Sequence, residues 1–211
     1  MNLALLFNKP FIGCIVGDVN EAKSNTLYYI LDELKKVGTF NLYVYGLKSE
    51  IAGSIKINSV DELEKIKHSV IILDEVMSLW DLDNRMAKRQ IENTLRLIYH
   101  NNNILLLSAV PSNIKKFISN KITLIIYKKV TFGDFINGSS IKRTILNYKG
   151  VERGSSLLNL DKDEAIIFDG EHYNKINIPY LEEYDSKKNN PQIVKKGVND
   201  TVNGSVINYR I

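Results

Sequence analysis

The chain has 211 residues, 44% of them hydrophobic, and a formal net charge of +4 at pH 7. This length suits one domain with a full hydrophobic core and a small appendage. No apolar run reaches the length of a membrane span and no cleavable leader is recognisable, so we expect a soluble, cytoplasmic protein, in the host cytoplasm if it is viral. A single cysteine, Cys14, excludes an internal disulfide, and three scattered histidines indicate no zinc site.

A strand, a loop and a helix are the first predicted elements. The apolar run at 11–16 predicts a strand, and apolar residues at helical spacing over 25–37, closed by Gly38, predict a helix. The residues between them, 17–24, read G-D-V-N-E-A-K-S. This spacing, in this strand-loop-helix setting, is typical of a phosphate-binding P-loop, or Walker A motif.

The chemistry of such a loop assigns its residues. Successive backbone N–H groups and the positive end of the helix would surround a phosphate, Lys23 would reach the β- and γ-phosphates, and the Ser24 hydroxyl would ligate Mg²⁺. Ala22 stands where a glycine usually precedes the lysine. The alternative is a strand-to-helix turn with an incidental Lys-Ser pair. The candidate ATP-binding residues are Gly17, Asp18, Val19, Asn20, Glu21, Ala22, Lys23, Ser24 and Asn25.

A second motif follows a predicted strand at 39–45 and a short predicted helix at 60–67. Residues 69–75 contain an apolar run of four, at 70–73, that ends in Asp74 and Glu75, as expected of a buried parallel strand whose carboxyl end opens into a site. Asp74 would hold Mg²⁺ as a Walker B aspartate, and Glu75 would orient the attacking water. The alternative is a strand followed by a capped helix.

The later elements complete the predicted fold. We expect a helix at 83–100, a strand at 104–108, a helix at 111–118 and a strand at 122–127, which together predict an α/β fold with a mainly parallel sheet. Short strands are expected at 141–148, 165–169 and 173–178, the last two forming a hairpin that turns at 170–171 on the sheet edge. The predicted organisation is a core at 1–150, a small C-terminal β extension at 151–184 and a tail at 185–211 that is mobile without a partner.

The motifs at 17–25, 71–75 and 103–108, with the basic helix after Arg85, resemble those of the ASCE division of P-loop ATPases. The nearest match is to the small FtsK–HerA-type and Zot-like ATPases of viruses and mobile elements. The resemblance implies a three-layer P-loop NTPase fold, ATP and Mg²⁺ as cofactors, and Ser108 as the polar sensor beside the γ-phosphate. It also implies a catalytic set of Lys23, Glu75 and Ser108. ATPases of this kind commonly act as homo-oligomeric rings with an arginine finger, for which the candidates are Arg85, Arg143 and Arg153.

Charge is unevenly distributed along the chain. Residues 111–149 carry eight basic residues against Asp134 alone, a balance of +7, whereas residues 50–83 carry eight acids against three lysines, a balance of −5. Such asymmetry indicates either a surface for the phosphates of DNA or opposite faces that meet between subunits. Ordinary solvated lysines are the alternative.

Three functions follow from these features. The first is an Mg-ATP-hydrolysing protein that handles DNA during packaging, transfer or replication. The second, favoured by Ala22, is a nucleotide-binding structural or regulatory protein with a degenerate P-loop and little turnover. A small-molecule phosphotransferase is disfavoured, because no arginine-rich lid segment follows the fourth predicted strand.

Overall fold

The computed structural model describes residues 9–75, 85–111, 114, 116–131, 157–169 and 172–181. The elements in chain order are β1 (Phe11–Val16), α1 (Lys23–Val37), β2 (Asn41–Tyr45), β3 (Ser54–Lys56), α2 (Val60–Leu63), β4 (Ser69–Leu73), α3 (Arg85–His100), β5 (Ile104–Ala109), α4 (Lys116–Ser119), β6 (Leu124–Tyr127), β7 (Glu164–Phe168) and β8 (Tyr173–Asn177).

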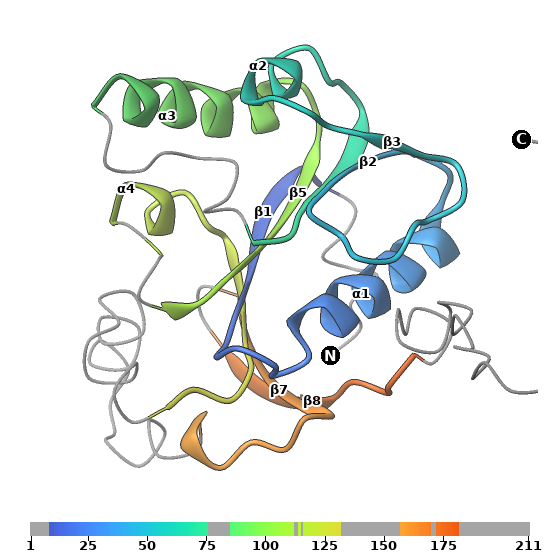
Figure 1. Cartoon of the computed structure of the whole chain (residues 1–211), viewed down its shortest axis with the longest axis vertical. Coiled ribbons are helices and arrows are strands. Elements are labelled where there is room, and N and C mark those ends of the chain that lie inside the picture. Colours follow the sequence, from blue (N-terminus) through green and yellow to red (C-terminus); the bar gives the residue numbers. More distant parts are fainter. Residues whose placement is uncertain are drawn as a thin grey trace, which may run out of the picture.

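All eight strands form one sheet, in the order β3-β2-β4-β5-β1-β6-β7-β8. The six strands from β3 to β6 pair in parallel, and the hairpin of β7 and β8 joins the β6 edge in antiparallel fashion. Helix α1 lies on one side of the sheet, while α3 and α4 lie on the other (Figure 1). The predicted three-layer α/β fold with a mainly parallel sheet is therefore confirmed.

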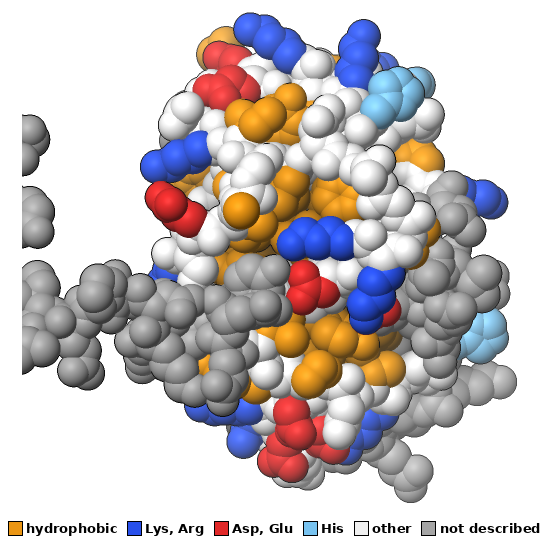
Figure 2. Space-filling view, turned by 90° about the vertical axis from the view of Figure 1, so that its right-hand side faces the viewer, with side chains coloured by type: hydrophobic (Ala, Val, Ile, Leu, Met, Phe, Trp, Pro, Cys, Tyr) orange, Lys and Arg blue, Asp and Glu red, His pale blue; other side chains and the backbone are white. Residues whose placement is uncertain are grey.

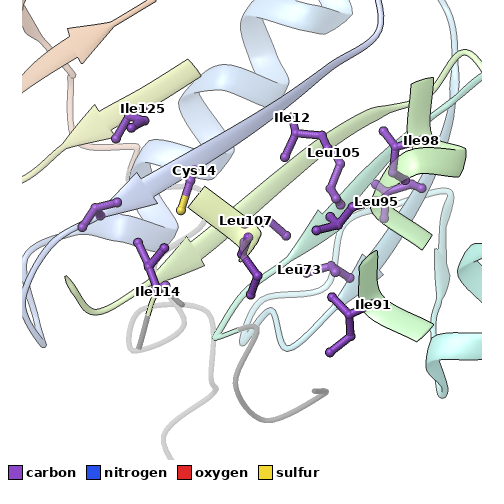
Figure 3. Close-up of a cluster of buried hydrophobic side chains, with 14 of the residues drawn as sticks. Ile12, Cys14, Leu73, Ile91, Leu95, Ile98, Leu105, Leu107, Ile114 and Ile125 are labelled. Carbon is purple, nitrogen blue, oxygen red and sulfur yellow. The ribbon is translucent and has the colours of Figure 1, made fainter. Parts of the chain in front are cut away.

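Alternation along the central strands supplies a core to each helical layer. Ile12 and Cys14 of β1 point toward α3 and α4, together with Leu105 and Leu107 of β5 (Figure 3). The residues between them pack on the α1 side, as Ile15 and Leu106 do. Burial raises the pKa of the Cys14 thiol to about 12, so Cys14 is a neutral core residue, as expected.

Strand register brings the predicted motifs to one edge of the sheet. Strand β5 lies between β1 and β4. Ile15 of β1 pairs with Ser108 of β5, and Leu73 of β4 pairs with Leu107 of β5. The loop after β1, the end of β5 and the residues after β4 therefore meet at the carboxyl ends of three neighbouring parallel strands, where open α/β sheets bind ligands.

Most predicted elements are present, but some helix ends differ from those expected. Helix α1 begins at Lys23 rather than at residue 25. Helix α2 ends at Leu63 rather than at residue 67, because side chains capture the backbone carbonyls that follow it. Asn101 Nδ2 donates to the carbonyls of Glu64 and Ile66, and Asn103 Nδ2 also donates to that of Ile66. The described part of the predicted helix at 111–118 is α4, which begins only at residue 116.

Strand β3 was not expected from the sequence, because three residues on a sheet edge leave little pattern. The expected strand at 141–148, the turn at 170–171 and the tail at 185–211 lie outside the described residues. Within the described part of the chain, no helix has the combined length and hydropathy needed to cross a bilayer.

Candidate nucleotide-binding site

Two hydroxyl groups hold the carboxylate of Asp74 at the edge of the sheet. Ser24 Oγ donates to Asp74 Oδ2 at 2.7 Å, and Ser108 Oγ donates to Asp74 Oδ1. Ser108 Oγ in turn accepts the backbone N–H of Glu75 at 3.0 Å. Asp74 is only 3% exposed and Ser108 is fully buried. The structure therefore brings together the last residue of the loop motif, the acidic pair and the predicted polar sensor.

The position of Asp74 depends on a glycine that the sequence analysis missed. The Asp74 N–H donates to the carbonyl of Tyr45 at 2.9 Å, which extends the β2–β4 pairing by one residue. Gly46 follows directly, at φ +75°, and a Cβ placed there would lie 2.3 Å from the Asp74 carbonyl oxygen. Only glycine suits both the backbone conformation and the close approach. A glycine directly after a predicted strand was the available signal.

Hydrogen bonds fix the beginning of the loop, whereas the backbone N–H groups at its end have no partner within the helix. The N–H groups of Gly17 and Asp18 donate to the carbonyls of Ala109 and Lys129, at 3.3 and 3.0 Å. At the other end, the N–H of Thr26 makes the first helical bond, to Ala22 at 3.1 Å. The four N–H groups of residues 22–25 precede that bond and have no partner within the helix. These donors, at the positive end of a helix of 15 residues, are suited to an anion.

Ala22 adopts the conformation that explains the usual glycine at its position. Its φ of 55° and ψ of 33° are left-handed, a region that costs a residue with a Cβ about 1–2 kcal/mol. Asn20 is also left-handed, at φ 66°, but asparagine tolerates this region well. The loop thus contains two left-handed residues, with a modest strain at Ala22.

Lys23 lies among carboxylates. Its Nζ donates to the Asp18 carbonyl at 2.7 Å. Burial lowers the pKa of Lys23, and the charges of Asp74, Glu75, Asp18 and Glu21 oppose that shift. Four acids around one ammonium leave the site negative, so a polyanionic phosphate needs a cation to accompany it.

The donors at the site suit Mg²⁺ held jointly with a phosphate. Among the described residues, no group of three or more His, Cys, Asp or Glu could hold a metal ion by itself. Mg²⁺ commonly keeps several waters and takes only one or two protein ligands when it is bound with phosphates. The Ser24 hydroxyl and the Asp74 carboxylate are oxygen ligands of that kind, 2.7 Å apart.

Glu75 combines an exposed side chain with an unusual backbone. Its φ is 51°, in the left-handed region, where a glutamate is strained. Its N–H is tied to Ser108, so the residue is fixed directly beside Asp74. Strained residues at a sheet edge, held by their surroundings, are common in active sites. This geometry agrees with the predicted placing of Glu75 at the site.

Asn25 and the three arginine-finger candidates are among the other residues predicted from the sequence. The side chain of Asn25 is occupied away from the loop: Nδ2 donates to the Pro179 carbonyl at 3.0 Å, and Oδ1 accepts the Leu181 N–H at 2.9 Å. Only the backbone N–H of Asn25 is then available to a phosphate. Among the arginine-finger candidates, Arg85 begins α3, while Arg143 and Arg153 lie outside the described residues.

Lys128, counted with the basic segment 111–149, is not a surface lysine. It is fully buried, and its Nζ donates to the carbonyls of Lys162 and Glu164, at 2.6 and 2.7 Å. Burial lowers the pKa of Lys128 to about 8, against the charges of Asp163, Glu21 and Glu164. Lys128 is therefore unavailable to DNA. The basic composition of the segment could not reveal this, because the hairpin that covers Lys128 comes more than thirty residues later.

Solved structures that share this fold include a viral genome packaging NTPase, a conjugation coupling protein and a secretion ATPase. The chain superposes on the genome packaging NTPase B204 of Sulfolobus turreted icosahedral virus 2 in complex with sulfate, with a TM-score of 0.59, 17% identity, and coverage of 82% of this chain and 98% of that one. The same protein in complex with ATPγS gives a TM-score of 0.57 at 17% identity, covering 82% and 100%.

The pCW3 conjugation coupling protein TcpA, with ATPγS, gives a TM-score of 0.60 at 16% identity, covering 86% of this chain and 63% of that one. The cytoplasmic domain of the Type VII secretion ATPase EccC from Thermomonospora curvata gives 0.57 at 12% identity, covering 81% and 25%. The sequence matches no protein-family model and no curated protein. The P-loop ATPase fold that the sequence resemblance implied is thus confirmed by structure.

Replacing Ala22 with glycine should stabilise the protein. Glycine removes left-handed strain of about 1–2 kcal/mol but gives back about 0.5–1 kcal/mol of backbone entropy. We expect Ala22→Gly to raise the free energy of unfolding by about 0.5–1 kcal/mol in urea titrations. The matched substitution Ala87→Gly, within α3, should instead lower it by about 1 kcal/mol. A loss of stability in both variants would contradict the assigned loop conformation.

The stability contributed by Lys128 should depend on pH. Below pH 8 the ammonium is charged in both folded and unfolded chains, and the folded state bears its full desolvation. Because the folded pKa is about 8 and the ordinary value is 10.5, the parent should gain stability over Lys128→Met as the pH rises between these values. Urea unfolding at pH 7.5, 9 and 10.5 measures this difference. Lys129→Met, at the exposed neighbouring position, is measured in parallel as the control.

Proposed function

We propose that this chain binds Mg-ATP at residues 17–25 and hydrolyses it while handling DNA in packaging, transfer or replication. The observation that carries the proposal is the buried Asp74 carboxylate between the hydroxyls of Ser24 and Ser108, next to the open helix N-terminus. A strand-to-helix turn with an incidental Lys-Ser pair would not need a buried carboxylate against its serine. ATPγS complexes of the fold relatives B204 and TcpA support ATP as the ligand.

Lys23 and the N–H groups of residues 22–25 are the proposed phosphate ligands. The Lys23 ammonium donates to the Asp18 carbonyl in this structure. With ATP bound it would turn to the β- and γ-phosphates, because a hydrogen bond to a charged oxygen is stronger than one to a neutral carbonyl. Ser24 and Asp74 would hold the metal ion. Mg²⁺, when bound, neutralises charge that develops on the phosphate oxygens during transfer.

Glu75 is the proposed group that orients the attacking water. Its exposed carboxylate can accept a proton from water, and its backbone is fixed through Ser108. The same hydroxyl bonds Asp74, so Ser108 links the metal-holding acid to the water-orienting acid. A change at the γ-phosphate would thus reach the Asp74 carboxylate and the Glu75 backbone through one side chain.

DNA is the proposed macromolecular partner, because the fold relatives include a genome packaging NTPase and a conjugation coupling protein and because residues 111–149 are basic. Lys121 and Lys129 are exposed, whereas Lys128 is not. On the face near β2, β3 and α1, acidic and basic side chains are interspersed (Figure 2). That mixed surface is poorly suited to a phosphate backbone, which leaves the basic segment as the favoured contact.

A nucleotide-binding structural or regulatory protein with little turnover is the second candidate, because Ala22 departs from the usual motif. The secretion ATPase EccC shares this fold as well, so the fold by itself does not select DNA over another cargo. ATP hydrolysis by the purified chain, measured with and without DNA, separates these functions. An ATPase stimulated by DNA supports the first, and binding without turnover supports the second.

Lys23→Ala should remove ATP binding without unfolding the protein. Truncating one partner of a charge-assisted pair costs about 2–5 kcal/mol, so we expect affinity for Mg-ATP to fall by roughly two orders of magnitude or more. Isothermal titration calorimetry measures the affinity, and circular dichroism checks the fold. An exposed lysine near the end of α1 provides the control, Lys36→Ala. Equal affinity in parent and Lys23→Ala would refute the P-loop assignment.

Glu75→Gln should separate turnover from binding. The amide keeps the shape but loses the charge that orients water, so we expect ATP affinity within about twofold of the parent and hydrolysis lowered roughly 10²-fold or more. Single-turnover hydrolysis isolates the chemical step. Glu50→Gln, at an exposed position, should hydrolyse at the parent rate. A Glu75→Gln rate equal to the parent's would show that this acid takes no part in catalysis.

DNA binding should be weak, sensitive to salt, and independent of the tail. We expect it to survive deletion of residues 185–211 and to fall when Lys115, Lys116 and Lys129 are changed together to glutamine. Each lost phosphate contact should flatten the slope of log K against log salt by about 0.9 on duplex DNA. Changing Lys48, Lys56 and Lys65 removes the same charge from elsewhere and should leave the slope unchanged. Identical slopes in both triple variants would exclude the basic segment as the DNA contact.

A further inference from the structure

The C-terminal hairpin is fastened to both ends of the nucleotide-binding loop. The base of this hairpin, defined here as residues 162–164 and 178–181, comprises the segments next to the start of β7 and the end of β8. Ile178 N–H donates to the Asp163 carbonyl at 2.6 Å, which joins the two segments. Because β7 runs antiparallel to β6, this base lies at the carboxyl end of β6, on the same sheet edge as the loop.

The first attachment is at Lys128, beside the start of the loop. Its ammonium bonds two carbonyls of the hairpin base, while its N–H donates to Val16 at 2.7 Å. A Cβ built on Gly17 would lie 2.6 Å from Lys128 Cβ, so the loop begins in direct contact with the stem of this lysine. Lys128 therefore spans the distance between the first loop residue and the hairpin.

The second attachment is at Asn25, just after the end of the loop. Its amide uses both functional atoms on the hairpin base, one on the Pro179 carbonyl and one on the Leu181 N–H. Ile178 is buried and Leu181 is partly buried in the core beneath α1, so the segment between them cannot shift freely. Asn25 follows Ser24 directly, and any movement of this segment acts on the first turn of α1.

We infer that the base of the C-terminal hairpin is a working part of the nucleotide-binding site, with Lys128 and Asn25 as positioning residues that hold the two ends of the loop. This inference rests on the proposed nucleotide binding. Neither side chain is needed as a phosphate ligand, since both are already committed to backbone groups of the hairpin base. Binding at the loop and order in the hairpin must then favour each other, because coupling between two sites is reciprocal.

Hydrogen exchange and nucleotide titration of the full chain test the inference. In the parent, Mg-ATPγS should slow exchange of the Leu181 amide and of amides in β7. In Asn25→Ala and Lys128→Met, affinity for Mg-ATPγS should fall about tenfold, within the range of measured site-to-site couplings. Asn177→Ala, at an exposed position of the hairpin, is the matched control and should bind within twofold of the parent. If Lys128→Met does not fold, Asn25→Ala alone decides.

A second arm without nucleotide keeps the inference independent of the ligand. In free Asn25→Ala, exchange of the Leu181 amide and of the Asp18 amide at the loop should both accelerate, whereas Asn177→Ala should change neither. Parent-like nucleotide affinity in both positioning variants, or nucleotide protection that stops at the loop, would overturn the inference while leaving nucleotide binding intact. A parent that binds no nucleotide would overturn the proposed function instead, and the free-protein arm would still report whether the loop depends on the hairpin.

Discussion

The buried carboxylate of Asp74 is the constraint on which the candidate site depends. A carboxylate at 3% exposure is stable only if its lone pairs are satisfied, and here two hydroxyls from different elements satisfy them. One hydroxyl comes from the first turn of α1 and the other from the end of β5. Asp74 therefore holds the N-terminus of α1, which follows the loop, against the end of β5. A ligand that recruits Asp74 and Ser24 to a metal ion would exchange their mutual bond for metal bonds, which lets nucleotide state reach the sheet.

A second buried charge, that of Lys128, lies beside the start of the loop. Lys128 is held by two neutral carbonyls, which accept two of its three ammonium hydrogens but only weakly offset the loss of water, and burial accordingly lowers its pKa. Buried charges of this kind are weak sources of stability, and a hydrophobic residue of similar shape is often as good. The lysine instead connects two segments, since no apolar side chain could bond the Lys162 and Glu164 carbonyls while packing against Gly17. Lys128 thus positions the start of the loop against the hairpin, although its burial lowers the stability of the fold.

The sequence predicted the strands and helices of the site better than the contacts between them. The sequence predicted three strands whose carboxyl ends lead to the loop before Ser24, to Asp74 and to Ser108. Because parallel strands bring such ends to one edge of a sheet, these residues could be assigned to one site. Nothing local stated that β5 lies between β1 and β4, so the shared bonding of Asp74 could not be foreseen. Gly46 and Lys128 were missed for a related reason, since their roles arise from partners far along the chain. The shortened α2 likewise reflects Asn101 and Asn103, which override a local helical pattern.

The strain at Ala22 bears on whether the chain turns over ATP. The residue is already left-handed in the structure, so its methyl group imposes its penalty before any nucleotide arrives. A penalty that is equal in the free and bound loop cancels from the binding free energy, and one that is equal in the ground and transition states cancels from the barrier to hydrolysis. Ala22 can then slow catalysis only if its methyl group touches the phosphate or if the loop changes conformation at that residue. Departure from the glycine of the motif is therefore an argument about stability first. An inactive loop would instead need the loss of a residue proposed for binding or turnover, and Lys23, Asp74 and Glu75 are all present in the sequence.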